Sequence, residues 1–313
     1  MSLETNREKK IVLYGAGRQG KRLYDFLESK KMEGLVYGFC DRNAKTLVQY
    51  KDKKIWQPDE LAEQNVIYCI AAFGDKRIKE IRDDLGENAN CIELNELADY
   101  IGEGRVEFNR EFCRFCHVED MNEYFANAES TLSTFWSEES PFYLMFQKLD
   151  LSNIIELGCG RGRHVQEYIE NAGQVMLVDI VQENIDICRE RFKGDGRVHC
   201  YKNDGYDLRE LADDSYTALY TYDAMVHFEM IDIYFYLKDI YRVLHKGGRA
   251  LFHHSNNTRD YKHSFANAPH GRSFMSKDIF AYLSYRAGFT VLEQRVIDWG
   301  GEAELDCISL LEK

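Results

Sequence analysis

The sequence predicts an α/β protein with two doubly wound, Rossmann-like domains. Short apolar strands alternate with helices of amphipathic spacing in two separate stretches, and each stretch contains a glycine-rich turn directly after a strand. This alternation is typical of parallel sheets that carry helices on both faces. The length of 313 residues is also sufficient for two domains.

The first stretch, residues 1–104, predicts a small Rossmann-like domain of the nucleotide-binding type. We expect its strands at the apolar runs of residues 10–14, 35–40, 66–73 and 91–94. Apolar residues at helical spacing follow the first and the third of these runs. Gly102 and Gly104 mark the expected end of the domain.

Residues 105–150 are rich in aromatic side chains and carry no strand pattern. They predict a helical connector that also serves as a lid over a cofactor. Trp136 and Phe142 lie just before the second glycine-rich turn, so they are candidates either to cover the cofactor or to pack in the core. We favour core packing for both.

In residues 151–313 the alternation of strands and helices restarts. We expect strands at residues 154–157, 175–179, 218–222 and 249–254, with amphipathic helices among them. The final part differs, because two apolar runs at residues 291–297 and 305–311 are joined by Gly300 and Gly301. Such a pair predicts a β-hairpin that closes the sheet.

The turn at residues 156–162 (ELGCGRG) is the candidate cofactor loop. Glycines let the backbone pass close beneath a ligand and leave the N–H groups of the next helix accessible. Asp179 ends the next strand about 20 residues further on, where a carboxylate is placed to accept ribose hydroxyls. Asp204 ends the following strand, where an adenine edge would lie, and Tyr222 ends the fourth.

Five segments resemble, in order and spacing, those of class I S-adenosylmethionine-dependent methyltransferases: ELGCGRG, VDI, NDG, YTYDAMVHF and IYRVLHKGGRALF. The resemblance covers about residues 150–313, or 105–313 with the connector, and implies a seven-stranded sheet with a C-terminal hairpin. It implies that Gly158 and Gly160 line the methionine end of the cofactor, that Asp179 binds its ribose and that Asp204 approaches its adenine amine. The cofactor-binding candidates are Glu156, Gly158, Cys159, Gly160, Gly162, Asp179, Ile180, Asp204, Gly205 and Tyr222.

The turn at residues 15–20 (GAGRQG) follows a strand, and Asp41 lies about 20 residues beyond it, as in a dinucleotide fingerprint. The domain is short for a complete dinucleotide fold, and it resembles the small N-terminal domains of bacterial nucleotide-sugar-modifying enzymes. Three alternatives stay open: a nicotinamide cofactor, a nucleotide or nucleotide-sugar, or an empty scaffold for oligomerisation. The candidate residues of this second nucleotide site are Gly15, Gly17, Gly20 and Asp41.

Two histidines at carboxyl ends of strands are the catalytic candidates. A histidine is suited to accept a proton near neutral pH, and ligands bind at the carboxyl ends of strands in doubly wound sheets. We predict that His254 is the base and that His227 orients the acceptor, with an exchange of roles left open. His253 is expected on the opposite face of its strand, which also argues against a metal site at these adjacent histidines.

Composition and charge limit the partners and the cellular location that we expect for this protein. Acidic residues outnumber basic residues by 53 to 40, and the net charge of −13 argues against nucleic acids and anionic membranes as partners. There is no apolar run of membrane-spanning length and no secretory signal at the start.

Nine irregularly spaced cysteines indicate a cytoplasmic protein. The run CRFCH at residues 113–117 has the spacing of a haem-attachment motif, but without an export signal we predict no haem or other metal there.

The sequence therefore predicts a methyltransferase that uses S-adenosylmethionine to O-methylate a small polar acceptor such as a sugar or a glycan precursor. One alternative is an NAD(P)-dependent oxidoreductase, or a bifunctional enzyme, that uses the GAGRQG turn. No Tyr-x-x-x-Lys pair follows in residues 42–104, which counts against it. Another alternative is a non-catalytic binding or assembly protein. Assembly into a homo-oligomer stays open.

Overall fold

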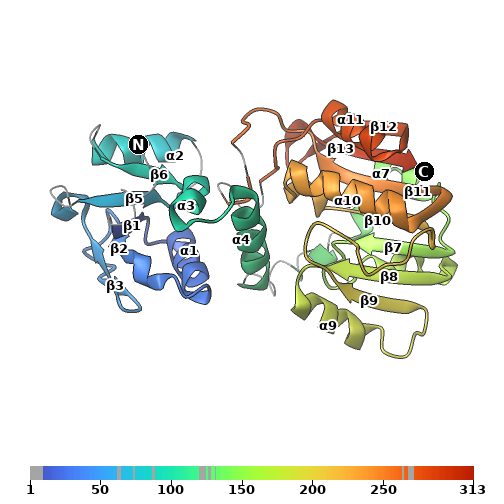
Figure 1. Ribbon diagram of the computed structural model, residues 1–313, viewed down its shortest axis with the longest axis horizontal. Helices are drawn as coiled ribbons and strands as arrows, with labels where there is room; N and C mark the ends of the chain where they lie inside the picture. The colour runs from blue at the N-terminus through green and yellow to red at the C-terminus, as the bar shows by residue number, and fades with distance from the viewer. Residues whose placement is uncertain are drawn as a thin grey trace. The chain divides into compact units, whose positions relative to one another are not determined.

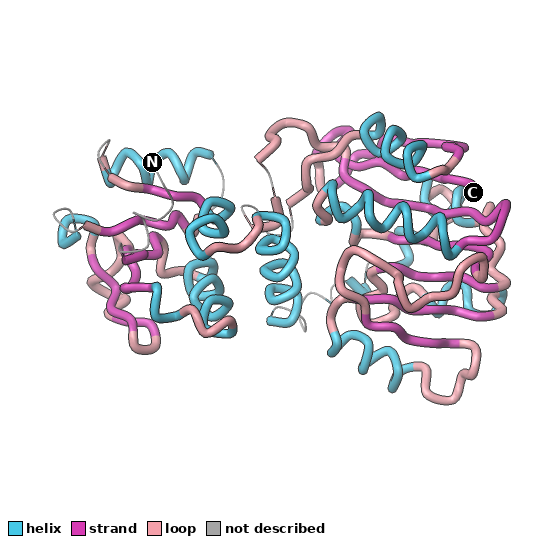
Figure 2. The backbone as a smooth tube through the Cα atoms, viewed as in Figure 1, coloured by secondary structure: helices cyan, strands magenta, loops and turns pink. Residues whose placement is uncertain are grey.

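The chain forms two compact units, Met1–Cys116 with Ala266–Pro269 and His117–Phe265 with His270–Lys313. Each unit is built around one mostly parallel sheet with helices (Figures 1 and 2), which confirms the predicted α/β class. The domain boundaries at residues 104 and 150 stay a prediction. The computed structural model describes residues 10–61, 65–72, 75–86, 89–119, 125, 128–130, 132–262, 264–266 and 271–313.

The first unit has a six-stranded sheet in the order β3-β4-β2-β1-β5-β6. The strand β1 pairs in parallel with both β2 and β5, so the direction of winding changes between β1 and β5. The short strands β3 and β4 extend the sheet and were not predicted, because each is too short to show an alternating pattern. The strands are β1 (Lys10–Tyr14), β2 (Val36–Cys40), β3 (Gln49–Tyr50), β4 (Lys53–Trp56), β5 (Val66–Ile70) and β6 (Cys91–Glu93).

The predicted glycine turn of the first unit connects β1 to the first helix. A Cβ on Gly20 would lie 1.8 Å from the carbonyl oxygen of Gly15, so only glycine fits this close approach of helix and turn. Leu23, Phe26 and Leu27 then bury one side of the helix. The helices of this unit are α1 (Arg18–Ser29), α2 (Asp75–Leu85), α3 (Leu94–Ile101) and α4 (Arg105–Glu119).

The second unit has a seven-stranded sheet in the order β12-β13-β11-β10-β7-β8-β9. Only β13 runs antiparallel to its neighbours, β11 and β12, so the predicted terminal hairpin is confirmed. The strands are β7 (Asn153–Leu157), β8 (Gln174–Asp179), β9 (Val198–Lys202), β10 (Tyr216–Thr221), β11 (Leu244–Ser255), β12 (Thr290–Trp299) and β13 (Glu302–Glu312).

Alternate residues of the central strands enter two hydrophobic cores, one on each face of this sheet. In β11, Phe252 packs with Phe280 in one core, and Leu251 packs with Phe142 and Tyr220 in the other. This alternation follows from the two-residue period of a strand. The helices are α6 (Leu132–Phe135), α7 (Pro141–Phe146), α8 (Val165–Tyr168), α9 (Gln182–Arg191), α10 (Met230–Val243) and α11 (Lys277–Ala287).

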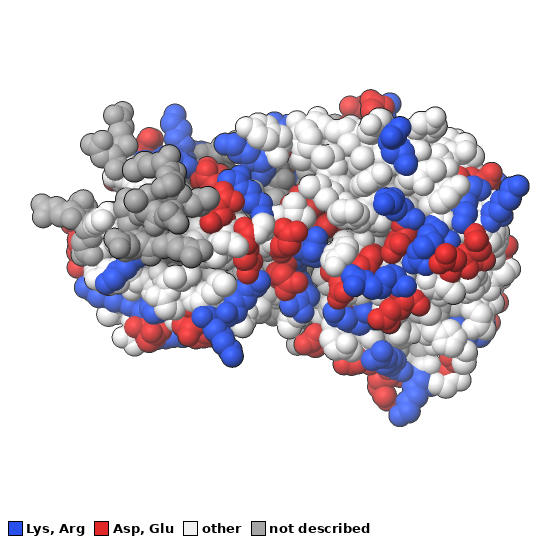
Figure 3. Space-filling view, in the orientation of Figure 1, with Lys and Arg blue, Asp and Glu red and all other residues white. Residues whose placement is uncertain are grey.

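The surface of the second unit carries charges of both signs. Figure 3 shows Lys and Arg interspersed with Asp and Glu around α9 and α10, where several form ion pairs along one helix, such as Arg189 with Asp186 and Arg242 with Asp239. Within the described residues, no helix combines the length and the apolar character that a membrane span needs.

Candidate functional site

The loop after β7 has a backbone that requires glycine. Gly158, Gly160 and Gly162 have φ angles of 72°, 52° and 71°, in the left-handed region that residues with a Cβ avoid. A Cβ on Gly158 would lie 2.5 Å from the Cβ of Ala224, and one on Gly160 would lie 2.8 Å from the ring of Phe125. The loop is therefore closely packed from both sides.

The carboxylate of Asp179 ties the glycine loop to the end of β8. Its Oδ2 accepts the Gly160 N–H at 2.8 Å, and its Oδ1 accepts the Val181 N–H at 2.8 Å and the Asn184 side-chain amide at 3.2 Å. Burial raises the pKa of Asp179, and these hydrogen bonds oppose the rise. The structure thus brings Asp179 and the glycine loop together, as the spacing of the motifs predicted.

The end of β9 adjoins the same loop and contributes Asn203, which the sequence places in the NDG segment without giving it a role of its own. The Asn203 N–H donates to the carbonyl oxygen of Asp179 at 3.1 Å. The side-chain amide of Asn203 donates to Tyr236 Oη and to the Asp207 carbonyl, whereas its Oδ1 is buried with no partner among the described residues. The predicted residue Asp204 is exposed and forms ion pairs with Lys202 and Arg209.

The ends of β9 and β10 and the helix α9, which follows β8, offer polar atoms for a bound molecule. The buried oxygens Asn203 Oδ1, Asn184 Oδ1 and Thr221 Oγ1 have no hydrogen-bond partner among the described residues. A buried polar atom without a partner is costly, so such atoms point to a missing ligand or water. Beside a glycine loop and a carboxylate, this set fits a nucleoside with a polar tail, which is the chemistry of S-adenosylmethionine.

The other predicted cofactor residues lie in or shortly after the strands β7, β8, β9 and β10. Glu156 is buried in β7, where Tyr168 Oη donates to its Oε2 at 3.1 Å and burial raises its pKa to about 7. The thiol of Cys159 is buried against the Gly160 carbonyl. Ile180 directly follows β8, Gly205 has a φ of 90°, and Tyr222 is buried after β10.

The predicted placement of His254 is wrong. The imidazole is fully buried and stacks on Phe280 with ring centroids 3.9 Å apart. Its ring nitrogens contact the Ser255 carbonyl at 2.9 Å and Ser309 Oγ at 2.8 Å. Burial lowers the pKa of His254 to about 3. The side chain lies on the Phe252 face of the strand, inside the core, so it has no access to an acceptor.

His253 lies on the opposite face of β11, as predicted, and this face is the one with polar partners. The Asp223 N–H donates to His253 Nδ1 at 3.1 Å, so Nε2 carries the ring proton and donates to Asp306 Oδ2 at 2.9 Å. The rings of Tyr222 and Trp299 pack on this imidazole with centroids 4.7 and 4.8 Å away.

Asp306, the partner of His253, also forms a buried ion pair with Arg272. Arg272 Nε and Nη2 donate to the two oxygens of Asp306 at 2.8 and 2.6 Å, and the Asp306 side chain is 0% exposed. Burial would raise the pKa of Asp306, but the hydrogen bonds from His253 and Arg272 outweigh it and lower that pKa. Asp306 was missed because an acidic residue in an apolar strand does not reveal its partner, which comes from a distant segment.

His227 lies in the 3₁₀ turn Met225–His227 after β10. Its Nδ1 lies 2.7 Å from the Gly271 carbonyl oxygen, so Nδ1 carries the proton and Nε2 is the acceptor nitrogen. His227 therefore has a defined tautomer in the turn after β10, and its role in orienting an acceptor stays a prediction.

Trp136 and Phe142 pack in the core of the second unit, as we favoured. Phe142 is fully buried, and the indole of Trp136 contacts Phe142 and Phe146 while its N–H donates to His164 Nδ1 at 2.9 Å. The nearby Arg163 donates to the carbonyl of Ala128 at 2.9 Å. A role of residues 105–150 as a cofactor lid stays a prediction.

The turn of the first unit repeats the bonding of the second. Asp41 Oδ2 accepts the Ala16 N–H at 2.8 Å, and Asp41 Oδ1 accepts the Asn43 N–H at 2.8 Å. These are the counterparts of the two backbone bonds of Asp179. Gly15 has a φ of 110°, and a Cβ there would lie 3.1 Å from the Ala71 carbonyl oxygen. Gly17 precedes α1, whose N-terminus has no side-chain cap.

The predicted haem-like run lies on α4, where Cys116 is buried. In the described ranges of the chain, no group of three or more His, Cys, Asp or Glu side chains is arranged to hold a metal ion.

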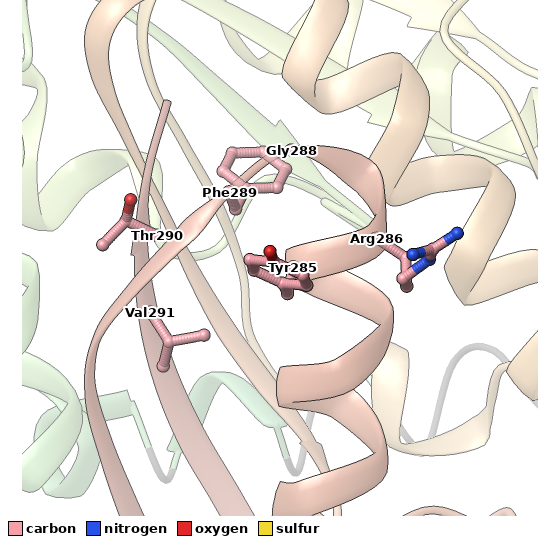
Figure 4. Close-up of a pocket in the computed structure, with 6 residues that line it drawn as sticks. All are labelled: Tyr285, Arg286, Gly288, Phe289, Thr290 and Val291. Atoms are coloured by element: carbon pink, nitrogen blue, oxygen red, sulfur yellow. The ribbon is translucent and has the colours of Figure 1, made fainter.

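A separate hollow of about 760 Å³ lies between the end of α11 and the start of β12 (Figure 4). Thr290 in its wall pairs with Glu312, whereas Ser255 and Asp306 pair at the opposite end of the sheet. The hollow therefore does not belong to the carboxyl-end site. Its lining residues are Tyr285, Arg286, Gly288, Phe289, Thr290 and Val291.

Comparison with known proteins agrees with this architecture. Residues 154–248 match a family model described as a methyltransferase domain. The domain match and the seven-stranded sheet with its terminal hairpin support a class I methyltransferase fold for the second unit. A search of curated proteins found no match.

Several solved structures are similar to part of the chain. An S-adenosylmethionine-dependent methyltransferase from Mesorhizobium loti has 14% identity and a TM-score of 0.46, over 55% of this chain and 97% of that chain. One from Methanosarcina mazei has 16% identity and a TM-score of 0.46, over 54% and 96%. A TehB-like one from Corynebacterium glutamicum has 17% identity and a TM-score of 0.43, over 61% and 97%.

We predict that Asp306→Ala lowers the free energy of unfolding by about 3–5 kcal/mol, because it leaves the Arg272 charge buried without its partner. Urea titration followed by circular dichroism measures this loss. Glu302→Ala is the control, because Glu302 pairs with Arg259 at the surface and its loss should cost less than about 1 kcal/mol. Equal losses from the two variants would contradict the importance assigned to the buried pair.

We also predict a pH-dependent stability term from Glu156. The pKa of its carboxyl rises from 4.5 in the unfolded chain to about 7 in the folded protein, so the folded state holds the proton more tightly. The resulting stabilisation is complete below pH 4.5 and is lost as the pH rises through about 7. Glu156→Gln should therefore be more stable than the wild type by roughly 2–3 kcal/mol at pH 8, and about equal at pH 4.5.

Urea titrations at several pH values test this prediction, with the exposed Glu183→Gln as the matched control. A difference between Glu156→Gln and the wild type that does not change from pH 4.5 to pH 8 would show that Glu156 titrates normally.

Proposed function

We propose that this protein is a methyltransferase that uses S-adenosylmethionine to O-methylate a small polar acceptor, such as a sugar or a glycan precursor. The observation that carries the proposal is the convergence of the glycine loop, Asp179 and unpartnered buried oxygens in the segment that matches a methyltransferase domain. An oxidoreductase or a purely structural role would not require this set in the second unit.

The chain's own residues divide the binding of the cofactor among them. Gly158 and Gly160 would lie beneath its methionine end, Asp179 would accept its ribose hydroxyls, and Asn203 and Asp204 would face its adenine. Bound S-adenosylmethionine supplies a methyl group on a cationic sulfur. The close packing of Phe125 on the loop helps to keep water away from this position.

The acceptor side of the proposal rests on other observations. His227, in the turn directly after β10, would orient the acceptor, as the sequence predicts. A sugar-like acceptor is supported by the resemblance of the first unit to domains of nucleotide-sugar-modifying enzymes. The net charge of −13 and the nine free cysteines support a small-molecule acceptor in the cytoplasm rather than a nucleic acid or a membrane.

A second candidate function concerns the first unit. Asp41 there makes the same two backbone hydrogen bonds as Asp179, beside an uncapped helix N-terminus. We propose on this ground that the first unit binds a nucleotide or a nucleotide-sugar. An NAD(P)-dependent activity would need a hydride-transfer group, which residues 42–104 do not suggest.

Isothermal titration calorimetry with S-adenosylhomocysteine tests the proposed function. We expect binding to the wild type, and at least tenfold weaker binding to Asp179→Ala, because two charge-assisted hydrogen bonds to the ribose are lost. Asp41→Ala is the matched control and should bind like the wild type. Well-folded wild-type protein that releases no heat of binding would refute the proposed cofactor.

Thermal denaturation with saturating UDP-N-acetylglucosamine or NAD tests the second candidate. A ligand that binds only the folded state raises the melting temperature, and we expect this rise with the nucleotide-sugar for the wild type and Asp179→Ala but not for Asp41→Ala. A rise with NAD alone would favour the oxidoreductase alternative. Unchanged melting with both compounds would leave the first unit as a scaffold.

A further inference from the structure

Asp223 lies beside the glycine loop in a backbone conformation that few residues adopt. Its φ angle is 54°, in the left-handed region where a side chain with a Cβ is strained. The next residue, Ala224, is so close to the loop that a Cβ on Gly158 would lie 2.5 Å from its Cβ. Strain of this kind persists only where the surrounding structure holds it, and it gathers at functional sites.

A connected set of buried side chains holds the backbone of Asp223 in this conformation. Nδ1 of His253 accepts the Asp223 N–H, Nε2 of His253 donates to Asp306, and Arg272 donates two hydrogen bonds to Asp306. His253 and Asp306 are both 0% exposed. We name His253, Asp306 and Arg272 the buried triad. Its connected bonds fix the backbone of Asp223 in one position.

The carboxylate of Asp223 is not saturated by these partners. Its oxygens lie 3.6 Å from Arg163 Nη2 and 3.8 Å from Arg272 Nη2, which are ion pairs beyond hydrogen-bond distance. The side chain is 17% exposed, in contrast to the buried triad. The carboxylate can therefore accept a hydrogen bond from a bound molecule without losing one of its own.

Aromatic side chains pack around Tyr222, the residue before Asp223, and against the buried triad. Tyr222 packs between Phe135 and His253, with centroid distances of 4.9 and 4.7 Å. Trp299 stacks on Phe135 with ring planes 11° apart, and the Arg272 guanidinium lies 5.1 Å from its ring centroid. These rings pack against His253 and Arg272 and so help to hold the buried triad in place.

We propose that Asp223 is the catalytic base of the methyl transfer and that the buried triad positions it. This inference rests on the proposed function and assigns the role that His254 cannot fill. The sulfonium carbon–sulfur bond breaks with its electron pair left on sulfur, and a bond forms between the methyl carbon and the acceptor oxygen or nitrogen. The acceptor proton passes to Asp223 Oδ and then to water. Bond formation makes that proton strongly acidic, so a carboxylate is a sufficient base.

The assignment also limits the acceptor. The attacking atom must carry a hydrogen for Asp223 to bind, which selects hydroxyl and amine groups.

The experiment combines two measurements on the full chain. The first is calorimetry with S-adenosylhomocysteine, which reports on the cofactor site. The second is transfer of label from methyl-tritiated S-adenosylmethionine to the chromatographic fraction of a small-molecule cell extract that the wild type labels. We expect Asp223→Asn to keep S-adenosylhomocysteine affinity within threefold and to lose at least 100-fold in kcat, with a smaller change in KM.

Variants of two residues in β11 distinguish a loss of Asp223 positioning from a general loss of folding. His253→Asn presents an amide oxygen that can accept the Asp223 N–H, so it should retain at least tenfold more transfer than His253→Leu. His254→Asn lies at the neighbouring position of the same strand but faces the core, and we expect a loss smaller than that of His253→Leu. Transfer rates are compared only among variants that bind S-adenosylhomocysteine with the same affinity, because equal affinity shows that the cofactor site is folded.

The outcomes discriminate between this inference and the proposed function. Near-normal transfer by Asp223→Asn, or a larger loss from His254→Asn than from His253→Leu, would overturn the assignment of the base while the methyltransferase function stands. A wild type that binds S-adenosylhomocysteine but labels no fraction would overturn both the small acceptor and the role of Asp223. A wild type that does not bind it would refute the proposed function itself.

Discussion

The hydrogen bond from the Gly160 N–H to the Asp179 carboxylate is the constraint on which the candidate site depends. It joins the turn after β7 to the end of β8, and the Asn203 N–H extends the connection to β9. The left-handed glycines make this path of the backbone feasible. Because the loop is fixed in this way, the ends of β7, β8 and β9 are held together by hydrogen bonds to one residue, Asp179.

The same device occurs in the first unit with Asp41 and Ala16. In both units, a carboxylate at the end of the next strand therefore accepts a backbone N–H of the turn between strand and helix. In the first unit the helix after this turn, α1, has no side-chain cap at its N-terminus, and such an end favours an anionic or polar ligand. A shared construction does not require a shared ligand, and the second unit differs by the polar oxygens it buries around its loop.

Buried charge is used differently on the two faces of β11. One face holds His254 as a neutral core residue against Phe280, and the other holds His253 in a connected group with Asp306 and Arg272. A buried ion pair adds little net stability compared with apolar packing, because desolvation offsets the attraction. Its more specific effect here is geometric, because it holds Asp223 in a conformation that the backbone alone would avoid.

The sequence by itself determined the α/β class, the glycine turns, the terminal hairpin and the position of Asp179 at the end of a strand. These features follow from local patterns: strand and helix periods, glycine spacing and residues at strand ends. It did not determine which of His253 and His254 faces the site, because strand parity fixes only that they differ, and the choice depends on which core each face meets. Asp306 and Arg272 also needed the tertiary structure, because a buried polar residue acquires its role from partners that lie far away in the chain.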